Sequence, residues 1–437
     1  MLQTFKNAWK VPELRKKILF TLMIILLYRI GATLTVPYVS VPDSTEASLL
    51  TGGLFQFMGL LSGSAFSQAT FFALSVSPYI TASIVMQLLT IAIPPLERLS
   101  KDEMGKKKIA SATRWVTVGL ALVTAYGYVN MLNMSGMLAI DDDVSDFFAW
   151  VVMIACFCAG ASLIMWLAEK INDHGIGNGI SIILFANILS GGTAAVQALI
   201  DMVPVEMENE ILGYVLGALE VVLSLAVALA AVVLVVWFTN SERRIKVIYA
   251  KKVVGRKMYG GQKTNLPLKM NMAGVMPVIF ASSIVSIPAT IAAFFPGSGF
   301  ADFVTAWLSQ TSPIYIIVFI ALIFAFSYFY IAISFNPVEV ANNIRSNGGA
   351  IIGIRPQEMA PFIKKILNRV TLMGAVFLVV ISATPMIVSA IVTAVGGNFT
   401  SVAFAGTSLL IVVGVALETV RDLEAQLSMR NYKGFLD

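Results

Sequence analysis

Residues 54–89 read LFQFMGLLSGSAFSQATFFALSVSPYITASIVMQLL, and this stretch decides how the chain can fold. It is apolar enough to enter a bilayer but longer than the roughly 20 residues that one transmembrane helix needs. Small and polar residues from Gly59 to Gln68 predict a half-helix and a loop, whereas residues 70–89 are long enough to span, with Pro78 inside the span. Non-helical backbone at membrane depth must be surrounded by protein or by a watery cavity. We therefore expect a cavity that holds a short segment.

The whole chain has the composition of a membrane protein. Of its 437 residues, 57% are hydrophobic and 13% are charged, and its apolar runs reach the length of transmembrane helices. We predict an all-α membrane protein with ten spans, near residues 18–36, 70–92, 109–132, 147–168, 180–200, 211–239, 270–295, 314–335, 366–394 and 399–417. With five spans each, an N-terminal half (1–200) and a C-terminal half (201–437) enter the membrane in opposite directions, as inverted repeats do.

The charges predict the orientation of the spans. The loops on one side carry acidic residues such as Asp141 and Asp302, without Lys or Arg, and the basic residues gather at the termini and on the other loops. The positive-inside rule places these basic parts, and so both termini, in the cytoplasm. The net charge of +5 then suits anionic lipids, acidic proteins or RNA. Arg29 alone is expected well inside a span.

The sequence offers little for catalysis or metal binding. Cys156 and Cys158 lie in one predicted span without a Cys or His nearby, so we expect buried, reduced thiols. No convincing cluster of acid, base and nucleophile is present, and no GxxxxGK[ST] loop would bind a nucleotide. The glycines between Gly175 and Gly179 predict a turn that caps a helix. We therefore predict no enzyme, no cofactor and no metal, and an external energy source.

Two basic loops, at about 240–269 and 336–365, are candidates for docking. In the first, the alternation over 244–247 and the Gly260-Gly261 pair predict an extended hairpin. Its many cations exceed what orientation needs, which favours a docking surface for RNA or a protein over a topology signal alone. The second loop presents Arg345 and Arg355, which from physics alone are surface charges.

Several ordered segments resemble the SecY family, the channel subunits of the bacterial protein translocase. They span both halves of the chain: SPYITASI (77–84), GIGNGIS (175–181), LPLKMNMAG (266–274), FNP (335–337), GIRP (353–356) and GTSLLIVV (406–413). The resemblance implies ten helices in two inverted five-helix halves, which form an hourglass channel with a plug and a lateral gate. It also implies partner subunits similar to SecE and SecG.

The resemblance assigns residues to the plug and to an apolar pore ring. The plug maps to Phe57, Met58, Gly59, Leu60, Leu61, Ser62, Gly63, Ser64, Ala65, Phe66 and Ser67. The ring maps to Val76, Ile80, Ile180, Leu184, Ile279 and Ile411. The spacing agrees, because two of these pairs are four residues apart and so share a helix face. Aliphatic side chains bind no ion and can gate by dewetting, although each alone would more often be ordinary packing.

The resemblance also places a lateral gate between the second and third spans and the seventh and eighth. Polar groups on two of these spans either keep the seam hydrated or hydrogen-bond between helices; they are Ser83, Gln87, Ser282 and Ser286. Docking of the motor ATPase SecA and of ribosomes maps to Arg243, Arg244, Lys251, Lys252, Arg256, Lys257, Arg345 and Arg355. Of these, Arg355 matches an arginine that SecA needs in the family. Two positions later, Gln357 stands where many relatives have glycine.

The implied function is a passive pore for unfolded preproteins and their signal sequences in the bacterial plasma membrane, with lateral release of transmembrane segments into lipid. SecA or a translating ribosome would supply the energy. The alternative is an inverted-repeat secondary transporter of a small solute. Such a transporter normally needs ionisable residues near the membrane midplane, and Arg29 is the only candidate. The sequence therefore favours the channel.

Overall fold

The computed structural model describes residues 2–40, 65–140, 144–201, 226, 229–249, 251–254, 257–260, 263–292, 295, 298–308, 312–394 and 405–433. The first half contains the helices α1 (Leu2–Lys10), α2 (Pro12–Gly31), α5 (Ser77–Ala92), α6 (Pro94–Lys101), α7 (Glu103–Met134), α8 (Asp146–His174) and α9 (Gly179–Asp201). A further helix, Leu229–Asn240, precedes the strands.

The second half contains strands as well as helices. The strands are β1 (Glu242–Tyr249), β2 (Lys251–Val254), β3 (Lys257–Gly260), β4 (Lys263–Lys269) and β5 (Gly349–Ile351). The helices are α11 (Met276–Ala292), α12 (Gly299–Trp307), α13 (Pro313–Ser334), α14 (Pro337–Ser346), α15 (Met359–Ala394) and α16 (Ala405–Lys433).

Each of the ten predicted spans overlaps a described helix. By length and composition, 4 of the described helices could cross a membrane, or up to 5 if the pair Ser77–Ala92 and Pro94–Ser100, bent by 109°, is one span. The chain is therefore a multi-pass helical membrane protein, while the count of ten spans stays a prediction.

The second span begins later than predicted. Thr70 forms an isolated β-bridge with Thr35, residues 71–76 form turns instead of helix, and α5 starts at Ser77. Ala69 (φ 46°) and Ser75 (φ 50°), which both precede α5, adopt the left-handed conformation, and a right-handed helix cannot include such residues. Pro78 thus lies in the first turn of α5, where proline has no hydrogen bond to lose. The prediction that Pro78 sits inside a longer helix was wrong.

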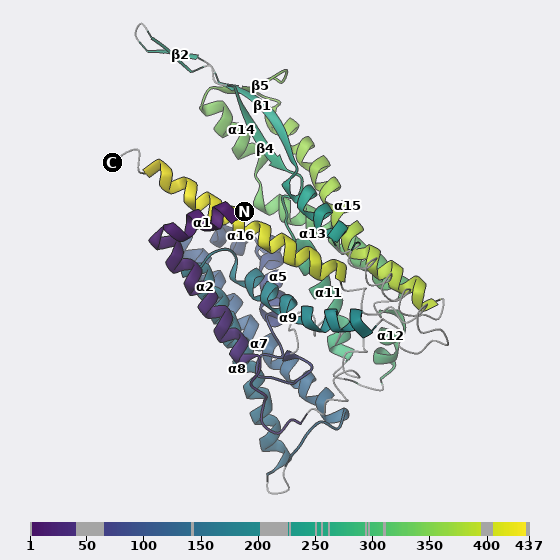
Figure 1. The fold of residues 1–437 in the computed structure, drawn as a ribbon. Coiled ribbons are helices and arrows are strands. Elements are labelled where there is room, and N and C mark those ends of the chain that lie inside the picture. Colours follow the sequence, from purple (N-terminus) through teal and green to yellow (C-terminus); the bar gives the residue numbers. More distant parts are fainter. Residues whose placement is uncertain are drawn as a thin grey trace, which may run out of the picture.

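The helices form two packed groups. In the N-terminal group, α2, α5, α7, α8 and α9 contact one another. In the C-terminal group, α13 packs against α11 and α15, and α15 packs against α16. The groups meet where α5 and α7 touch α11 and where α9 touches α16, which α1 also contacts. Figure 1 shows the N-terminal group in purple and blue and the C-terminal group in green, with α16 in yellow crossing between them.

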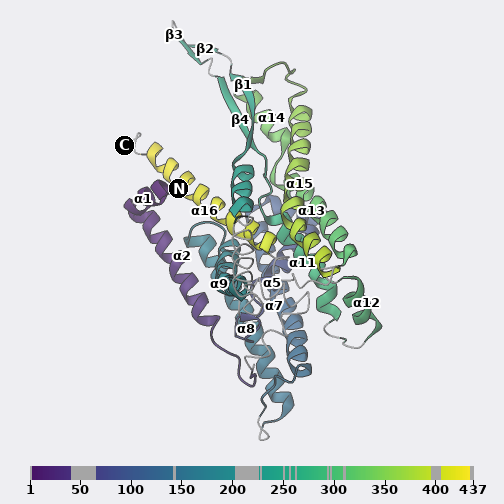
Figure 2. The ribbon, with the colours of Figure 1, turned by 45° about the vertical axis from the view of Figure 1, so that its right-hand side comes forward.

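The strands project from one end of the molecule, here called the hairpin end (Figures 1 and 2). β1 pairs antiparallel with β4 and also with β5, and β2 pairs with β3. Ile245 and Val247 are buried against α14 and α15, while Arg244 and Lys246 point outward. The predicted hairpin is confirmed. The third strand, β5, was not predicted, and it joins the two basic loops into one sheet.

The packing predicts a contrast between two helical glycines. A Cβ on Gly160 of α8 would lie 1.9 Å from the carbonyl oxygen of Phe71, whereas a Cβ on Gly119 of α7 would meet no atom within 4 Å. We expect Gly160→Ala to lower the unfolding free energy by about 1–3 kcal/mol because backbone must move. Gly119→Ala is the matched control and should be neutral or slightly stabilising. Thermal unfolding in detergent measures both, and equal melting temperatures would contradict the close approach.

Candidate functional site: the junction of the two helix groups

The six predicted ring residues meet at the junction. Val76 and Ile80 come from the start of α5, Ile180 and Leu184 from α9, Ile279 from α11 and Ile411 from α16. Five of them are buried in one hydrophobic cluster, and Ile180 is partly buried against it. The cluster contains many other apolar residues, so proximity is established while the role of a ring stays a prediction.

The six predicted ring residues are all aliphatic. The six side chains carry neither a charge nor a hydrogen-bonding group, so they cannot select one passing side chain over another by polar contacts. In an apolar cluster of this kind, water gains too few hydrogen bonds to remain. The arrangement can therefore close a path without a specific ligand. The described part of the chain likewise shows no group of His, Cys, Asp or Glu that could hold a metal ion, and Cys156 and Cys158 are free and half-buried.

Only the end of the predicted plug can be placed. Its residues Phe57 to Ser64 lie outside the described residues, and Ala65, Phe66 and Ser67 are buried. The Tyr128 hydroxyl of α7 donates a hydrogen bond to the carbonyl oxygen of Phe66, and the two rings lie 4.6 Å apart. The predicted plug is thus tied to the N-terminal group at its C-terminal end.

The segment 65–76, which links the predicted plug to α5, is held along its length. The amide of Phe71 donates to the carbonyl oxygen of Leu34 (2.8 Å), and the amide of Val36 donates to that of Ala69 (3.2 Å). The Phe72 ring stacks on Tyr28, with centroids 5.2 Å apart. The edge of the Phe72 ring fills the space beside Gly31. A Cβ atom added to Gly31 would lie only 2.1 Å from this ring. Backbone pairing and close packing therefore replace the missing helical hydrogen bonds.

Arg29 is bound within the N-terminal group. Its Nη2 donates a hydrogen bond to the carbonyl oxygen of Ala186 on α9 at 3.1 Å. The sequence alone does not reveal a partner for Arg29, and the structure shows that it binds a backbone carbonyl. This contact uses the arginine to join α2 to α9 and leaves it less suited to bind a solute.

The predicted gate residues make their hydrogen bonds within their own helices. Gln87 donates to Ser83 on α5 (3.3 Å), Ser282 donates to the carbonyl oxygen of Ile279 (2.9 Å), and Ser286 donates to that of Ser283 (2.7 Å). Among the described residues, these bonds do not bridge α5 and α11. The seam between these helices is therefore formed by packing.

The predicted docking residues gather at the hairpin end. Arg243 and Arg244 are exposed on β1, Arg345 is exposed at the end of α14, and Arg355 is exposed after β5. Lys251, Lys252 and Lys257 belong to β2 and β3, whereas Arg256 lies outside the described residues. The pairing of β5 with β1 brings the two loops together, so the exposed Arg243, Arg244, Arg345 and Arg355 lie at the same end of the molecule.

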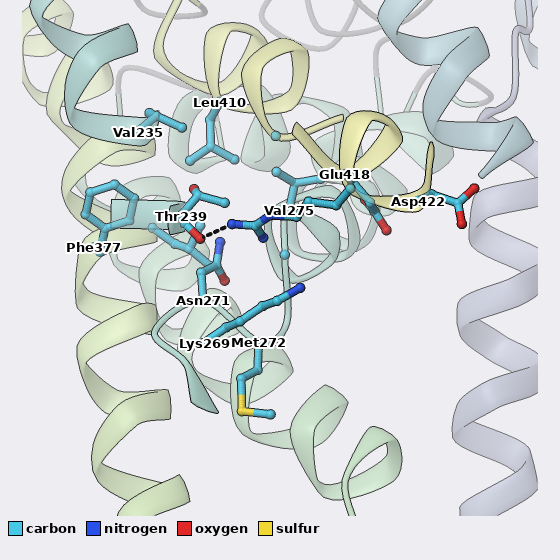
Figure 3. Close-up of a pocket in the computed structure, with 14 residues that line it drawn as sticks. Val235, Thr239, Lys269, Asn271, Met272, Val275, Phe377, Leu410, Glu418 and Asp422 are labelled. Carbon is cyan, nitrogen blue, oxygen red and sulfur yellow. Dashed lines mark hydrogen bonds between the residues drawn. The ribbon is translucent and has the colours of Figure 1, made fainter. Parts of the chain in front are cut away.

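A cavity of about 330 Å³ lies near the hairpin end, between the helix Leu229–Asn240, α15 and α16 (Figure 3). Charged residues of both signs line it: Lys269, Glu418, Arg421 and Asp422. Arg421 donates to the carbonyl oxygen of Thr239 at 2.7 Å. Desolvation raises the pKa of the Glu418 carboxyl, and the positive charge of Lys269 opposes this rise.

Contacts at this end also join the two groups. The amide of Gly177, in the glycine-rich turn between α8 and α9, donates to a carboxylate oxygen of Asp422 on α16 at 3.1 Å. Gly177 has φ 71°, a conformation that suits glycine. The predicted turn is confirmed. Its bond to Asp422 was not predicted, because nothing in the local sequence pairs residues so far apart.

Together, these features define a multi-pass helical membrane protein whose two groups of helices meet on an apolar surface. A SecY family model matches residues 70–420. The chain is 42% identical over 453 residues to the protein translocase subunit SecY of Streptomyces galbus, and 40% identical over 455 residues to that of Mycobacterium bovis. Each comparison covers 100% of both chains. The solved structure of a protein-conducting channel matches with TM-score 0.63 at 18% identity, covering 96% of each chain. This chain belongs to the SecY family.

The hold on Phe66 generates a prediction. Tyr128→Phe removes the hydroxyl that donates to the buried carbonyl oxygen of Phe66, which still accepts from the amide of Ala69 at 3.2 Å. We expect the unfolding free energy to fall by about 0.5–1.5 kcal/mol, the net contribution of one hydrogen bond. Tyr328→Phe is the control, because its exposed hydroxyl makes only a 3.5 Å contact. Thermal unfolding in detergent distinguishes the variants, and an unchanged Tyr128→Phe would mean that the bond contributes nothing.

Proposed function

We propose that the chain is the central pore subunit of a protein-conducting channel that translocates unfolded preproteins and releases transmembrane segments laterally into lipid. The observation that carries this proposal is the meeting of six aliphatic side chains from both helix groups at one junction. A conduit for unrelated polypeptides needs a constriction without preferred polar contacts, and aliphatic side chains supply it. The full-length similarity to protein translocase subunits supports the same proposal.

In this proposal the halves 1–200 and 201–437 part at the α5–α11 contact, the ring residues close around the passing chain, and residues 57–67 act as the plug. The membrane is the bacterial plasma membrane, with both termini in the cytoplasm. The arrangement supports this orientation, because α1 and the C-terminal part of α16 lie toward the hairpin end (Figure 1). The same end carries the exposed arginines of β1, α14 and the turn after β5.

The partners follow from the same surface. We propose that SecA and the ribosome dock on the hairpin end, that subunits similar to SecE and SecG complete the channel, and that anionic lipids lie against its basic residues. A related ribosome–channel complex contains Sec61, which matches with TM-score 0.61 at 16% identity. A secondary transporter is less suitable, because the bond from Arg29 to Ala186 occupies the cation expected deepest in a span.

The whole function is tested by reconstitution. Proteoliposomes that contain this chain with SecE-like and SecG-like subunits receive SecA, ATP and an unfolded preprotein. We expect the preprotein to become protected from added protease. Omission of ATP is the control. If protection does not exceed that control in vesicles where SecA binds, the channel proposal is wrong.

The proposed ring generates a prediction about Ile411. Ile411→Asn places an amide in the apolar cluster, where it attracts water, and we expect ion leak through reconstituted channels to rise on the order of tenfold. Discrimination between preproteins with and without a signal sequence should weaken as well. Ile411→Val keeps the surface apolar and serves as the control. Leak and selectivity equal to those of the parent in both variants would exclude Ile411 from the constriction.

The proposed docking surface generates a prediction about Arg355. Arg355→Glu reverses an exposed charge and should lower SecA-driven transport by about tenfold, while membrane insertion and folding stay intact. Lys107→Glu makes the same charge reversal at an exposed position of α7, outside both basic loops. Transport rates at equal channel density give the comparison. A loss of the same size in both variants would point to overall charge instead of a contact through Arg355.

A further inference from the structure

Three polar side chains meet inside the apolar junction. Tyr28 of α2 is 0% exposed, Ser75 of the segment before α5 is 2% exposed, and Asn187 of α9 is 0% exposed. The Asn187 amide nitrogen Nδ2 donates a hydrogen bond to the Ser75 hydroxyl oxygen at 3.1 Å. The Tyr28 hydroxyl faces the same two side chains, although it completes no hydrogen bond of ordinary geometry. We call Tyr28, Ser75 and Asn187 the polar cluster.

Such a cluster is costly unless its members stay together. A buried hydroxyl or amide loses its bonds to water and must regain them inside the protein. Around the polar cluster lie apolar residues of the junction, among them Ile24, Phe72 and Ile183. If Ser75 moved away, Asn187 would lose this partner where water is scarce. The bond therefore favours one position of the segment 65–76.

The backbone at Ser75 is also strained. Its φ of 50° is unusual for a residue other than glycine, and such a conformation persists only where the surroundings hold it. Here the Ser75 amide donates to the carbonyl oxygen of Phe72 at 2.9 Å while its side chain is bound by Asn187. Because this strained backbone persists only while its surroundings hold it, loss of the bond from Asn187 favours movement of Ser75.

Ser75 directly precedes Val76, the first residue of the proposed ring and the N-cap of α5. We infer that the hydrogen bond between Asn187 and Ser75 is a latch that positions Val76 and holds the segment 65–76 in the closed arrangement of the junction. Asn187 and Ser75 act as positioning residues, since they work through Val76. This inference rests on the proposed channel function. Opening of the junction then requires the latch to release.

Neighbouring contacts fix the helices that carry the latch. Arg29, the residue after Tyr28, bonds to Ala186, the residue before Asn187. The Tyr28 ring also stacks on Phe72 in the same segment, with planes 7° apart. Two successive residues of α2 therefore hold α9 and the segment together. With these helices fixed, the Asn187–Ser75 bond is the contact that can select between positions of Val76.

Two variants remove the latch in different ways. Asn187→Leu replaces the amide with an apolar group of similar size, and Ser75→Gly removes the hydroxyl while fitting the positive φ. We expect each to raise potassium leak from proteoliposomes of phosphatidylethanolamine and phosphatidylglycerol by roughly 5- to 150-fold, the range for losing one buried hydrogen bond. The double variant should leak no more than the leakier single variant, because both remove the same bond.

The matched control is Ser382→Ala. Ser382 is 0% exposed, and its hydroxyl bonds within α15 to the carbonyl oxygen of Leu378. Its removal deletes an equally buried hydroxyl without releasing the segment, so leak should stay at the parent level. Parent-level leak in Asn187→Leu and Ser75→Gly would overturn the latch, and so would a double variant whose increase is the product of the two single increases. If Asn187→Leu fails to fold, Ser75→Gly alone decides.

A second measurement does not depend on transport. In a chain whose native thiols are removed (Cys156→Ser, Cys158→Ser), Val76→Cys places one thiol at a position that is 1% exposed. A membrane-impermeant maleimide should label it at least about fivefold faster in the Asn187→Leu and Ser75→Gly backgrounds than in the Ser382→Ala background. Equal labelling rates would overturn the latch even if preprotein transport succeeds. Faster labelling without any transport would support the latch and refute the proposed function.

Discussion

The structure depends on one constraint: backbone inside an apolar surrounding must find its hydrogen bonds within the protein. The segment 65–76 is not helical, yet it is almost entirely buried. Extended residues after α2 supply backbone partners, Tyr128 supplies a side-chain donor, and Asn187 binds the last turn. Three parts of the N-terminal group therefore hold the segment that leads into α5. The position of the first ring residue follows from these contacts.

The same constraint separates two kinds of chemistry. Where the groups meet, aliphatic side chains predominate, and contacts between them have no preferred direction. Within the N-terminal group, directional bonds hold α2, α9 and the segment 65–76 in register. Packing without directional bonds does not fix the helices in one register, whereas a buried hydrogen bond holds its two partners in place. The molecule thus combines a hydrogen-bonded N-terminal group with a junction that is held mainly by apolar packing.

Much of this could be predicted from the sequence. The length of the apolar runs predicted the helices, and the alternation over 244–247 predicted the hairpin. The motifs that resemble the family predicted the six residues that meet at the junction. The start of α5 was missed because the left-handed residues Ala69 and Ser75 have no signal in composition. Asn187 was overlooked although a polar amide within a predicted span was visible. The pairing of β5 with β1, and of Gly177 with Asp422, joins residues too distant in sequence for any local pattern to reveal.

The position of the charges completes the argument. Exposed arginines lie on β1, at the end of α14 and after β5. The sheet is built from both loops of the C-terminal half and packs on α14 and α15. At the same end, Asp422 of α16 binds the turn between α8 and α9, and Lys17 of α2 bonds to Gln426 of α16 at 3.1 Å. A partner that pulls on the sheet would therefore act on the C-terminal group directly and on the N-terminal group through α16. The α5–α11 contact, which has no such polar tie among the described residues, is the place where that force would separate the groups.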